Sequence, residues 1–247
     1  MLSPKPWRLD AVLQLLAGIF VSMLAGSIVI GVLHHAGVAG FRGEEGLGMI
    51  LVGTLCLHGT ALVLIHFFLC YHQVSWSDAL GWGKGHFRQL IGPMILTVAF
   101  ILPVAGFLQM VSYALLTQLG HPPKEQEAVA LFSKSGSNLS TAYLIFFAVM
   151  LAPVAEELVF RGILYPFIKQ LGFPKLALVG VSLAFASIHG SLVILVPLFV
   201  FALAQTWLYE KTDCLFAPMI THATFNLSNL LIMFATGTLS QANGVHP

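Results

Sequence analysis

The chain has 247 residues, of which 57% are hydrophobic and 9% are charged. A soluble domain carries about 25% charged residues, so most of this surface is expected to face lipid rather than water. The formal net charge of +1 gives no electrostatic basis for a nucleic-acid partner.

Seven apolar segments follow one another along the chain. A bilayer-spanning α-helix needs about 20 mostly apolar residues. The segments that fit are residues 11–37, 49–71, 90–117, 140–161, 175–189, 192–209 and 215–234. The predicted fold class is therefore all-α, a polytopic transmembrane helical bundle of about seven helices. The chain divides into three regions. Residues 1–139 hold the first three helices and a polar connecting loop, residues 140–234 hold the remaining helices with the candidate catalytic residues, and residues 235–247 form a short tail.

The Lys and Arg residues of the short loops predict the orientation, because cytoplasmic loops carry an excess of both. With the N-terminus inside, the inner segments hold eight of these residues and the outer segments three. The inner ones are Lys5, Arg8, Lys84, Arg88, Arg161, Lys169, Lys175 and Lys211, and the outer ones are Arg42, Lys124 and Lys134. A cytoplasmic N-terminus is predicted, and the odd helix count places the C-terminus outside.

The second segment carries two histidines, His58 and His66. At about 100° per residue they lie about 80° apart, loosely on one face of the helix. A metal site or a proton path is conceivable, but neither histidine has a carboxylate nearby in its own helix. Interhelical hydrogen bonding or an interfacial position is the favoured interpretation.

The fourth segment carries two adjacent carboxylates, Glu156 and Glu157, after a long apolar run. Ionisable side chains at membrane depth are costly and mark function or pairing. Glu157 and Arg161 are four residues apart with the acid first, the favourable order for an intrahelical ion pair. Glu156 points about 100° away around the helix, so it is free to face a cavity, where a desolvated carboxylate suits a general base. A purely structural Glu–Arg clamp explains Glu157 and Arg161 but leaves Glu156 uncompensated.

One turn before the carboxylates, Pro153 removes a backbone hydrogen bond. It can open the helix at the point where water must enter.

Two further segments supply polar groups that match this carboxylate. His189 ends the fifth segment, and His222 and Asn226 lie four residues apart, on one face of the seventh. Each alone is compatible with an interhelical hydrogen bond. Together they support water-mediated acyl hydrolysis, in which Glu156 and His189 hold and deprotonate a water while His222 and Asn226 donate to the developing oxyanion.

Three motifs thus occur in order on three hydrophobic segments. They are Glu156-Glu157-x-x-x-Arg161, Phe185-x-x-x-His189 and His222-x-x-x-Asn226. These motifs resemble those of the CAAX protease and bacteriocin-processing (CPBP) family, which contains the type II CAAX prenyl proteases, over residues 140–232. The resemblance implies an all-helical fold around a water-filled polar cavity, Glu156 as catalytic base, and Glu157 with Arg161 as the supporting pair.

The function predicted on these grounds is that of an intramembrane endopeptidase. It would hydrolyse a peptide bond of a membrane-associated, prenylated or leader peptide. The predicted location is the bacterial plasma membrane, as a multi-pass protein. The predicted partners are the lipid bilayer and a peptide or protein substrate. The alternative is a membrane scaffold or bacteriocin self-immunity protein that binds a partner in the same cavity. A proton-coupled transporter also uses buried Glu and His, but it has no obvious use for an oxyanion donor pair.

Metal dependence stays open at this stage. Glu156, His189 and His222 could bind zinc with a water in the fourth position. The absence of an H-E-x-x-H motif favours a glutamate mechanism without a cofactor.

The predicted boundaries raise one difficulty of depth. With the fourth helix ending near Arg161, Glu156 lies about 10 Å from the cytoplasmic boundary, whereas His189 lies about 21 Å up the fifth helix. The fifth helix is therefore expected to be tilted or to end within the bilayer, with a break at Gly190 and Ser191.

Overall fold

The computed structural model describes residues 2–38, 40–41, 47–82, 87–121, 132 and 138–235. Over these residues the chain is helical and forms no strand, which confirms the all-α prediction. The N-terminal elements are α1 (Leu9–His35), α2 (Leu47–Thr54), η1 (Leu55–Gly59), α3 (Thr60–Tyr71), α4 (Trp76–Leu80) and α5 (Phe87–Gln118). The later elements are α7 (Asn138–Phe146), η2 (Phe147–Leu151), α8 (Ala152–Glu157), η3 (Leu158–Leu164), α9 (Tyr165–Gln170), α10 (Pro174–Ser187), α11 (Leu192–Thr212) and α12 (Phe216–Ala235).

Parts of the sequence prediction fall outside the described residues. They are most of the loop between His121 and Asn138, the C-terminal tail from residue 236 onward, and the loop cations Arg42, Lys84, Lys124 and Lys134.

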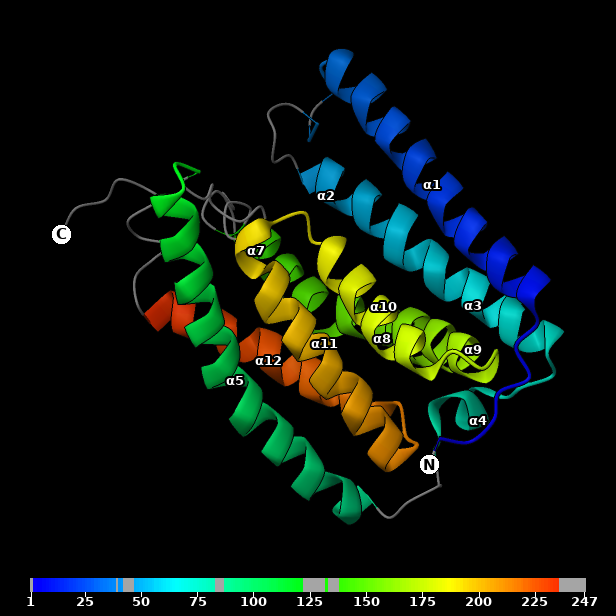
Figure 1. The fold of residues 1–247 in the computed structure, drawn as a ribbon. Helices are drawn as coiled ribbons and strands as arrows, with labels where there is room; N and C mark the ends of the chain where they lie inside the picture. The colour runs from blue at the N-terminus through cyan, green and yellow to red at the C-terminus, as the bar shows by residue number, and fades with distance from the viewer. Residues whose placement is uncertain are drawn as a thin grey trace.

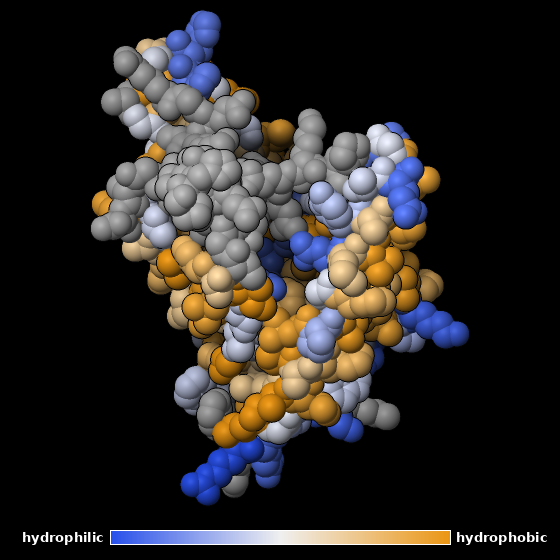
Figure 2. Space-filling view, turned by 90° about the vertical axis from the view of Figure 1, so that its left-hand side faces the viewer, coloured by the Kyte–Doolittle hydropathy of each residue, from blue (hydrophilic) through white to orange (hydrophobic). Residues whose placement is uncertain are grey.

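The chain is an integral membrane protein by the length and apolarity of its helices. Among the described residues, five segments are long and apolar enough to cross a bilayer: Leu9–His35, Leu47–Tyr71, Arg88–Gln118, Leu139–Gln170 and Leu192–Thr212. The other two predicted segments are also helical, as the 14-residue α10 and the 20-residue α12. Large apolar side chains are exposed along α1 and α5, and Figure 2 shows hydrophobic residues covering the middle of one face with hydrophilic ones toward its ends.

The helices form two groups (Figure 1). The hairpin of α1 with α2, η1 and α3 lies on one side, and α10, α11 and α12 pack with the helix of residues 138–170 on the other. The long helix α5 lies against α11 and α12. The core between these helices includes Phe185, Phe201 and Leu215, each wholly buried.

The fourth predicted helix is longer than the sequence suggested. It continues to Gln170 rather than ending at residue 161, so that prediction was wrong. Arg161 looked like a cytoplasmic boundary because it is charged, but its side chain is 1% exposed and paired inside the bundle. Arg161 therefore does not count as a loop cation, and the inner set falls from eight to seven against three.

Two prolines explain why this helix widens on either side of the carboxylates. The turns η2 and η3 are π-helical, with the N–H of Ala152 bonded to Phe147 and that of Tyr165 bonded to Phe160, five residues back. Pro153 and Pro166 follow directly. A proline lacks an N–H and its ring clashes with the carbonyl four residues earlier, and the wider π-turn relieves that clash.

The carbonyls that these prolines leave unpaired become anchoring points for other helices. The carbonyl of Ala148 accepts from the amide of Asn226 in α12 at 2.8 Å. That of Gly162 accepts from the indole Nε1 of Trp7, before α1, at 2.9 Å. The π-turns thus fix the helix of the carboxylates to both groups of helices.

A close backbone contact ties α4 to the start of α12. The N–H of Leu215 donates to the carbonyl of Leu80 at 2.9 Å. Gly81 adopts a φ of +72°, and a Cβ at that position would lie 2.4 Å from the carbonyl oxygen of Asp213. Only glycine fits here, because the position needs both a left-handed backbone and space beside another chain segment.

Candidate functional site

The centre of the site is the fully buried ion pair of Glu157 and Arg161. The guanidinium Nη1 lies 3.0 Å from Glu157 Oε1, and Nη2 donates to the carbonyl of Ala202 in α11 at 3.1 Å. The same guanidinium lies over the ring of Phe185 in α10, 4.6 Å from its centroid. One arginine thus neutralises the carboxylate and joins three helices.

His222 of α12 lies between the two glutamates. Its Nδ1 is 2.8 Å from Glu157 Oε1, and its Nε2 is 3.8 Å from Glu156 Oε2. Because an ionised carboxylate only accepts hydrogen bonds, Nδ1 carries the proton and donates to Glu157. The rings of Phe185 and Phe201 meet the imidazole edge-on and fix its plane.

Glu156 has a different environment from its neighbour in the sequence. Its side chain is 17% exposed, whereas that of Glu157 is 0% exposed. The contacts to its two oxygens are long, 3.9 Å from His58 Nε2 to Oε1 and 3.8 Å from His222 Nε2 to Oε2. The structure therefore separates the two carboxylates as the helix geometry predicted, with Glu157 tied down and Glu156 less constrained.

His189 follows the end of α10 on an exposed turn. Its Nδ1 lies 2.8 Å from the carbonyl of Phe185, which fixes the proton on Nδ1 and leaves Nε2 as an acceptor. The imidazole is near enough to Glu156 to interact with it electrostatically. Gly190, with a φ of +65°, ends the helix, so α10 is short as predicted.

The depth difficulty disappears with the longer fourth helix. Glu156 lies fourteen residues before Gln170, the end of that helix, and His189 fifteen residues after Pro174, the start of α10. At 1.5 Å per residue both are about 21–23 Å from the turn that joins the two helices. The expected difference in depth between Glu156 and His189 arose because the predicted end of the fourth helix lies nine residues too early.

Asn226 is placed on the same helix as His222, one turn later. Its Nδ2 donates to the carbonyl of Ala148 in η2, so one of its two N–H groups is used to hold α12 against the helix of the glutamates. The second N–H is not used in this bond.

The three predicted zinc ligands are not grouped as a metal site. In the ranges that the structure describes, no set of three or more His, Cys, Asp or Glu side chains could hold a metal ion. Glu156 and His222 are neighbours, while His189 interacts with Glu156 only electrostatically.

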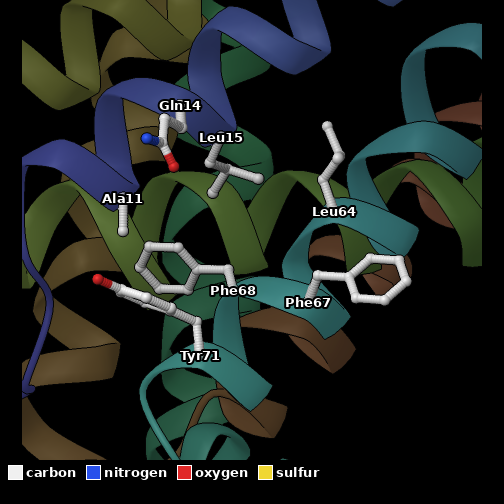
Figure 3. A pocket seen from close by; sticks show the side chains of 7 residues that line it. All are labelled: Ala11, Gln14, Leu15, Leu64, Phe67, Phe68 and Tyr71. Atoms are coloured by element: carbon white, nitrogen blue, oxygen red, sulfur yellow. The ribbon is translucent and has the colours of Figure 1, made fainter.

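A hollow of about 330 Å³ lies away from these residues, between α1 and α3. Figure 3 shows Ala11, Gln14 and Leu15 on one wall and Leu64, Phe67, Phe68 and Tyr71 on the other. None of the predicted site residues lines it, so it is a separate feature of the outer helices.

Comparison with known proteins supports the motif assignment. Residues 138–228 match the family model for the Rce1-like type II CAAX prenyl endopeptidases. A domain of the CAAX protease family therefore covers residues 138–228 of the chain. No curated protein and no solved structure matches the chain.

The CAAX protease domain holds every residue that the sequence motifs pointed to. Glu156, Glu157, Arg161, His189, His222 and Asn226 all lie within the matched range. His58 lies outside it, on η1, yet the structure places its imidazole beside Glu156. Sequence reasoning named His58 and favoured an interhelical contact for it, but did not join it to Glu156, because that carboxylate lies on another helix. The available signal was a histidine in the middle of an apolar segment.

Proposed function

We propose that the chain is an intramembrane endopeptidase that uses Glu156 to activate a water against a peptide bond of a membrane-associated substrate. The observation that supports this most is the unequal environment of the two adjacent glutamates. Glu157 is buried and paired with Arg161 and His222, whereas Glu156 keeps partial exposure and has no short contact from either neighbouring imidazole. A carboxylate that must take up and release a proton needs such freedom.

The oxyanion role requires His222 to carry a proton on both ring nitrogens, because Nδ1 already donates to Glu157. Two ionised glutamates and Arg161 carry a net charge of −1 in a buried environment, which is costly. A second proton on His222 makes the group neutral and turns Nε2 into a donor. Nε2–H is then the hydrogen that remains for an oxyanion.

The reaction then proceeds in two proton transfers. Water donates one hydrogen bond to Glu156 and one to the free Nε2 of His189, so that its lone pair faces the substrate carbonyl. Glu156 takes a proton as the C–O bond forms, and the Nε2–H of His222 with the second N–H of Asn226 stabilises the oxyanion. Glu156 returns the proton to the leaving nitrogen as the C–N bond breaks.

The family description and the membrane location support a proposal for the substrate class. Type II CAAX prenyl endopeptidases are the proteins described by the matching family model, so a prenylated C-terminal peptide is the first substrate to test. A leader peptide is the second. The proposed glutamate mechanism needs no metal. The proposed location is the bacterial plasma membrane.

The decisive experiment compares purified wild type with Glu156→Gln on membrane-tethered peptides. The panel contains a farnesylated peptide ending in Cys-aliphatic-aliphatic-X, the same peptide without the lipid, and a leader-type peptide. Wild type is expected to cleave at least one of them, and Glu156→Gln to lose about 10²–10⁴-fold in kcat, the usual contribution of a general base. Glu210→Gln is a matched control, because Glu210 pairs with Lys169 and Tyr165 rather than with the site.

Three results would contradict all or part of this proposal. Equal cleavage by wild type and Glu156→Gln would remove Glu156 from the mechanism. Inactivation by a chelator, with recovery on adding zinc, would replace the metal-free mechanism by a zinc one. Tight binding of a peptide that wild type never cleaves would favour the scaffold or immunity alternative.

A further inference from the structure

His58 is a buried histidine contributed by the N-terminal helices. It lies on the π-turn η1 between α2 and α3, and it is 7% exposed. Its ring meets that of Phe147 in η2 edge-on, with centroids 5.0 Å apart and an interplanar angle of 82°. The residue lies outside the range that matches the CAAX protease family, so the family motif assigns it no role.

The imidazole of His58 and that of His222 approach different oxygens of the proposed catalytic carboxylate. Its Nε2 is 3.9 Å from Glu156 Oε1, and His222 Nε2 is 3.8 Å from Oε2. Each oxygen of Glu156 therefore has its own imidazole, from a different helix. The contact from His58 is about 1 Å longer than an N–H···O hydrogen bond. Catalytic hydrogen bonds are often long before substrate binds and shorten in the complex.

The second ring nitrogen indicates the tautomer. Nδ1 of His58 is buried and has no hydrogen-bond partner among the described residues. A carboxylate accepts only, so the proton of neutral His58 belongs on Nε2, where it points at Glu156. Nδ1 is then the unprotonated nitrogen. An unpaired acceptor is a more common buried exception than an unpaired N–H.

We propose that His58 is a positioning residue for Glu156. It donates Nε2–H to Oε1, holds the carboxylate in one orientation and keeps it ionised until it takes the proton from water. The catalytic effect of this contact rests on the proposed function. The contact between His58 and Glu156 does not depend on that function. The N-terminal helices thereby complete a site whose other residues all come from the CAAX protease domain.

The other charged groups around Glu156 do not duplicate this role. His222 approaches the second oxygen but is bonded to Glu157 through Nδ1. His189 acts on Glu156 electrostatically from the end of α10. On the same helix Glu157 and Arg161 are bonded to each other. His58 is the group that faces Oε1.

The test uses the full-length protein in lipid nanodiscs and three variants. His58→Leu removes the donor while keeping an apolar side chain of similar reach, and His58→Gln keeps an N–H donor. His66→Leu is the matched control, because His66 lies on the same helical segment and its contacts are with Cys70 and Trp76. The first measurement is infrared titration of the carboxyl C=O band that disappears in Glu156→Gln, which needs no substrate.

The proposal predicts that in His58→Leu this band persists to a higher pH, by about one unit or more, because loss of a donor favours the neutral carboxyl. His58→Gln and His66→Leu titrate like wild type. With a peptide that wild type cleaves, His58→Leu lowers kcat about ten- to a hundredfold, as expected for a lost hydrogen bond to a charged group. It also moves the acid limb of the pH–rate profile to higher pH, and leaves KM unchanged.

An unchanged infrared titration in a folded His58→Leu protein would overturn the proposal. Equal losses in His58→Leu and His58→Gln, together with lower melting temperatures in both, would assign His58 a packing role instead. A shifted titration in a protein that cleaves none of the peptides would leave the positioning contact standing and reject the proteolytic function.

Discussion

At the scale of single residues, Arg161 shows why an arginine and not a lysine belongs in this bundle. Its two terminal nitrogens bond to Glu157 and to the carbonyl of Ala202, and its flat face lies over Phe185. A planar fork can make these contacts at once, whereas an ammonium is a compact point charge. The residue stabilises the position of three helices around the site.

Removing this guanidinium is expected to destabilise the protein strongly. Arg161→Leu leaves the wholly buried Glu157 without its cation, a loss of about 3–5 kcal/mol for a broken buried pair. Lys169→Leu is the control, because the pair of Lys169 with Glu210 is 30% and 25% exposed and pairs of that kind contribute about 0–1 kcal/mol. Thermal unfolding in detergent measures both. Similar melting temperatures for the two variants would show that the buried pair is not a main source of stability.

The residue scale also shows what helix geometry can predict from sequence. The spacing of Glu157 and Arg161 was sufficient for their pairing, because both lie on one helix. His58 and Glu156 lie on two different helices. The spacing of residues along one helix cannot predict a contact between two helices. The same limit applies to Asn226, whose bond to the carbonyl of Ala148 depends on how α12 packs on η2.

At the scale of helical elements, the prolines beside the site determine where backbone carbonyls are free. In a regular α-helix the carbonyl of Ala148 would bond to the N–H of Ala152, and in a π-turn to that of residue 153. Ala152 bonds instead to Phe147, and Pro153 has no N–H. Asn226 therefore donates to a carbonyl that has no partner within its own helix. The proline leaves this carbonyl unpaired, and the amide supplies the missing hydrogen bond.

Replacing Pro153 is expected to lower activity more than stability. Pro153→Ala supplies an N–H that can bond to Ala148 or Val149, so the turn can tighten to an α-helix and rotate Glu156 relative to its partners. Misplacement by about 1 Å can cost about a hundredfold in rate, measured as kcat on the peptide that wild type cleaves. Pro103→Ala, a change inside α5, should leave kcat within about threefold, because α5 carries none of the site residues. Full activity in Pro153→Ala would show that the π-turn is not needed to orient the carboxylate.

The element scale separates what hydropathy predicts from what it cannot. The seven apolar segments are all helical, and six of them have ends within three residues of the predicted ones. The fourth was wrong by nine residues at its end, because the charge of Arg161 suggests a membrane boundary although the helix continues to Gln170. A charged residue signals the membrane surface only if it is solvated, and burial of a paired charge is a tertiary property. The π-turns were likewise beyond the sequence, although Pro153 correctly indicated an opened helix.

At the scale of the whole molecule, five of the cations in the part of the chain that the structure describes lie at one end of the bundle. The start of α1, the turn between α9 and α10 and the end of α11 lie at the end where the N-terminus lies (Figure 1). They carry Lys5, Arg8, Lys169, Lys175 and Lys211. Contacts within this end support the arrangement, since Ser3 bonds to Asp213 and Lys5 to the carbonyl of Asp78. Anionic cytoplasmic lipid attracts each such cation by about 1 kcal/mol, so we infer that this end is cytoplasmic.

This orientation predicts a labelling pattern for cysteines at the two ends. Ser77 in α4 and Gln118 at the end of α5 are both exposed, and α5 runs from the end that holds the N-terminus to the opposite one (Figure 1). With Cys56, Cys70 and Cys214 replaced by alanine, a membrane-impermeant maleimide added to intact spheroplasts should label Gln118→Cys. It should reach Ser77→Cys only after the membrane is opened. The reverse pattern would place the positive end outside and contradict the orientation. The site would be unaffected by that result, because its geometry is internal to the bundle, but the aqueous side from which water and substrate reach Glu156 would have to be reassigned.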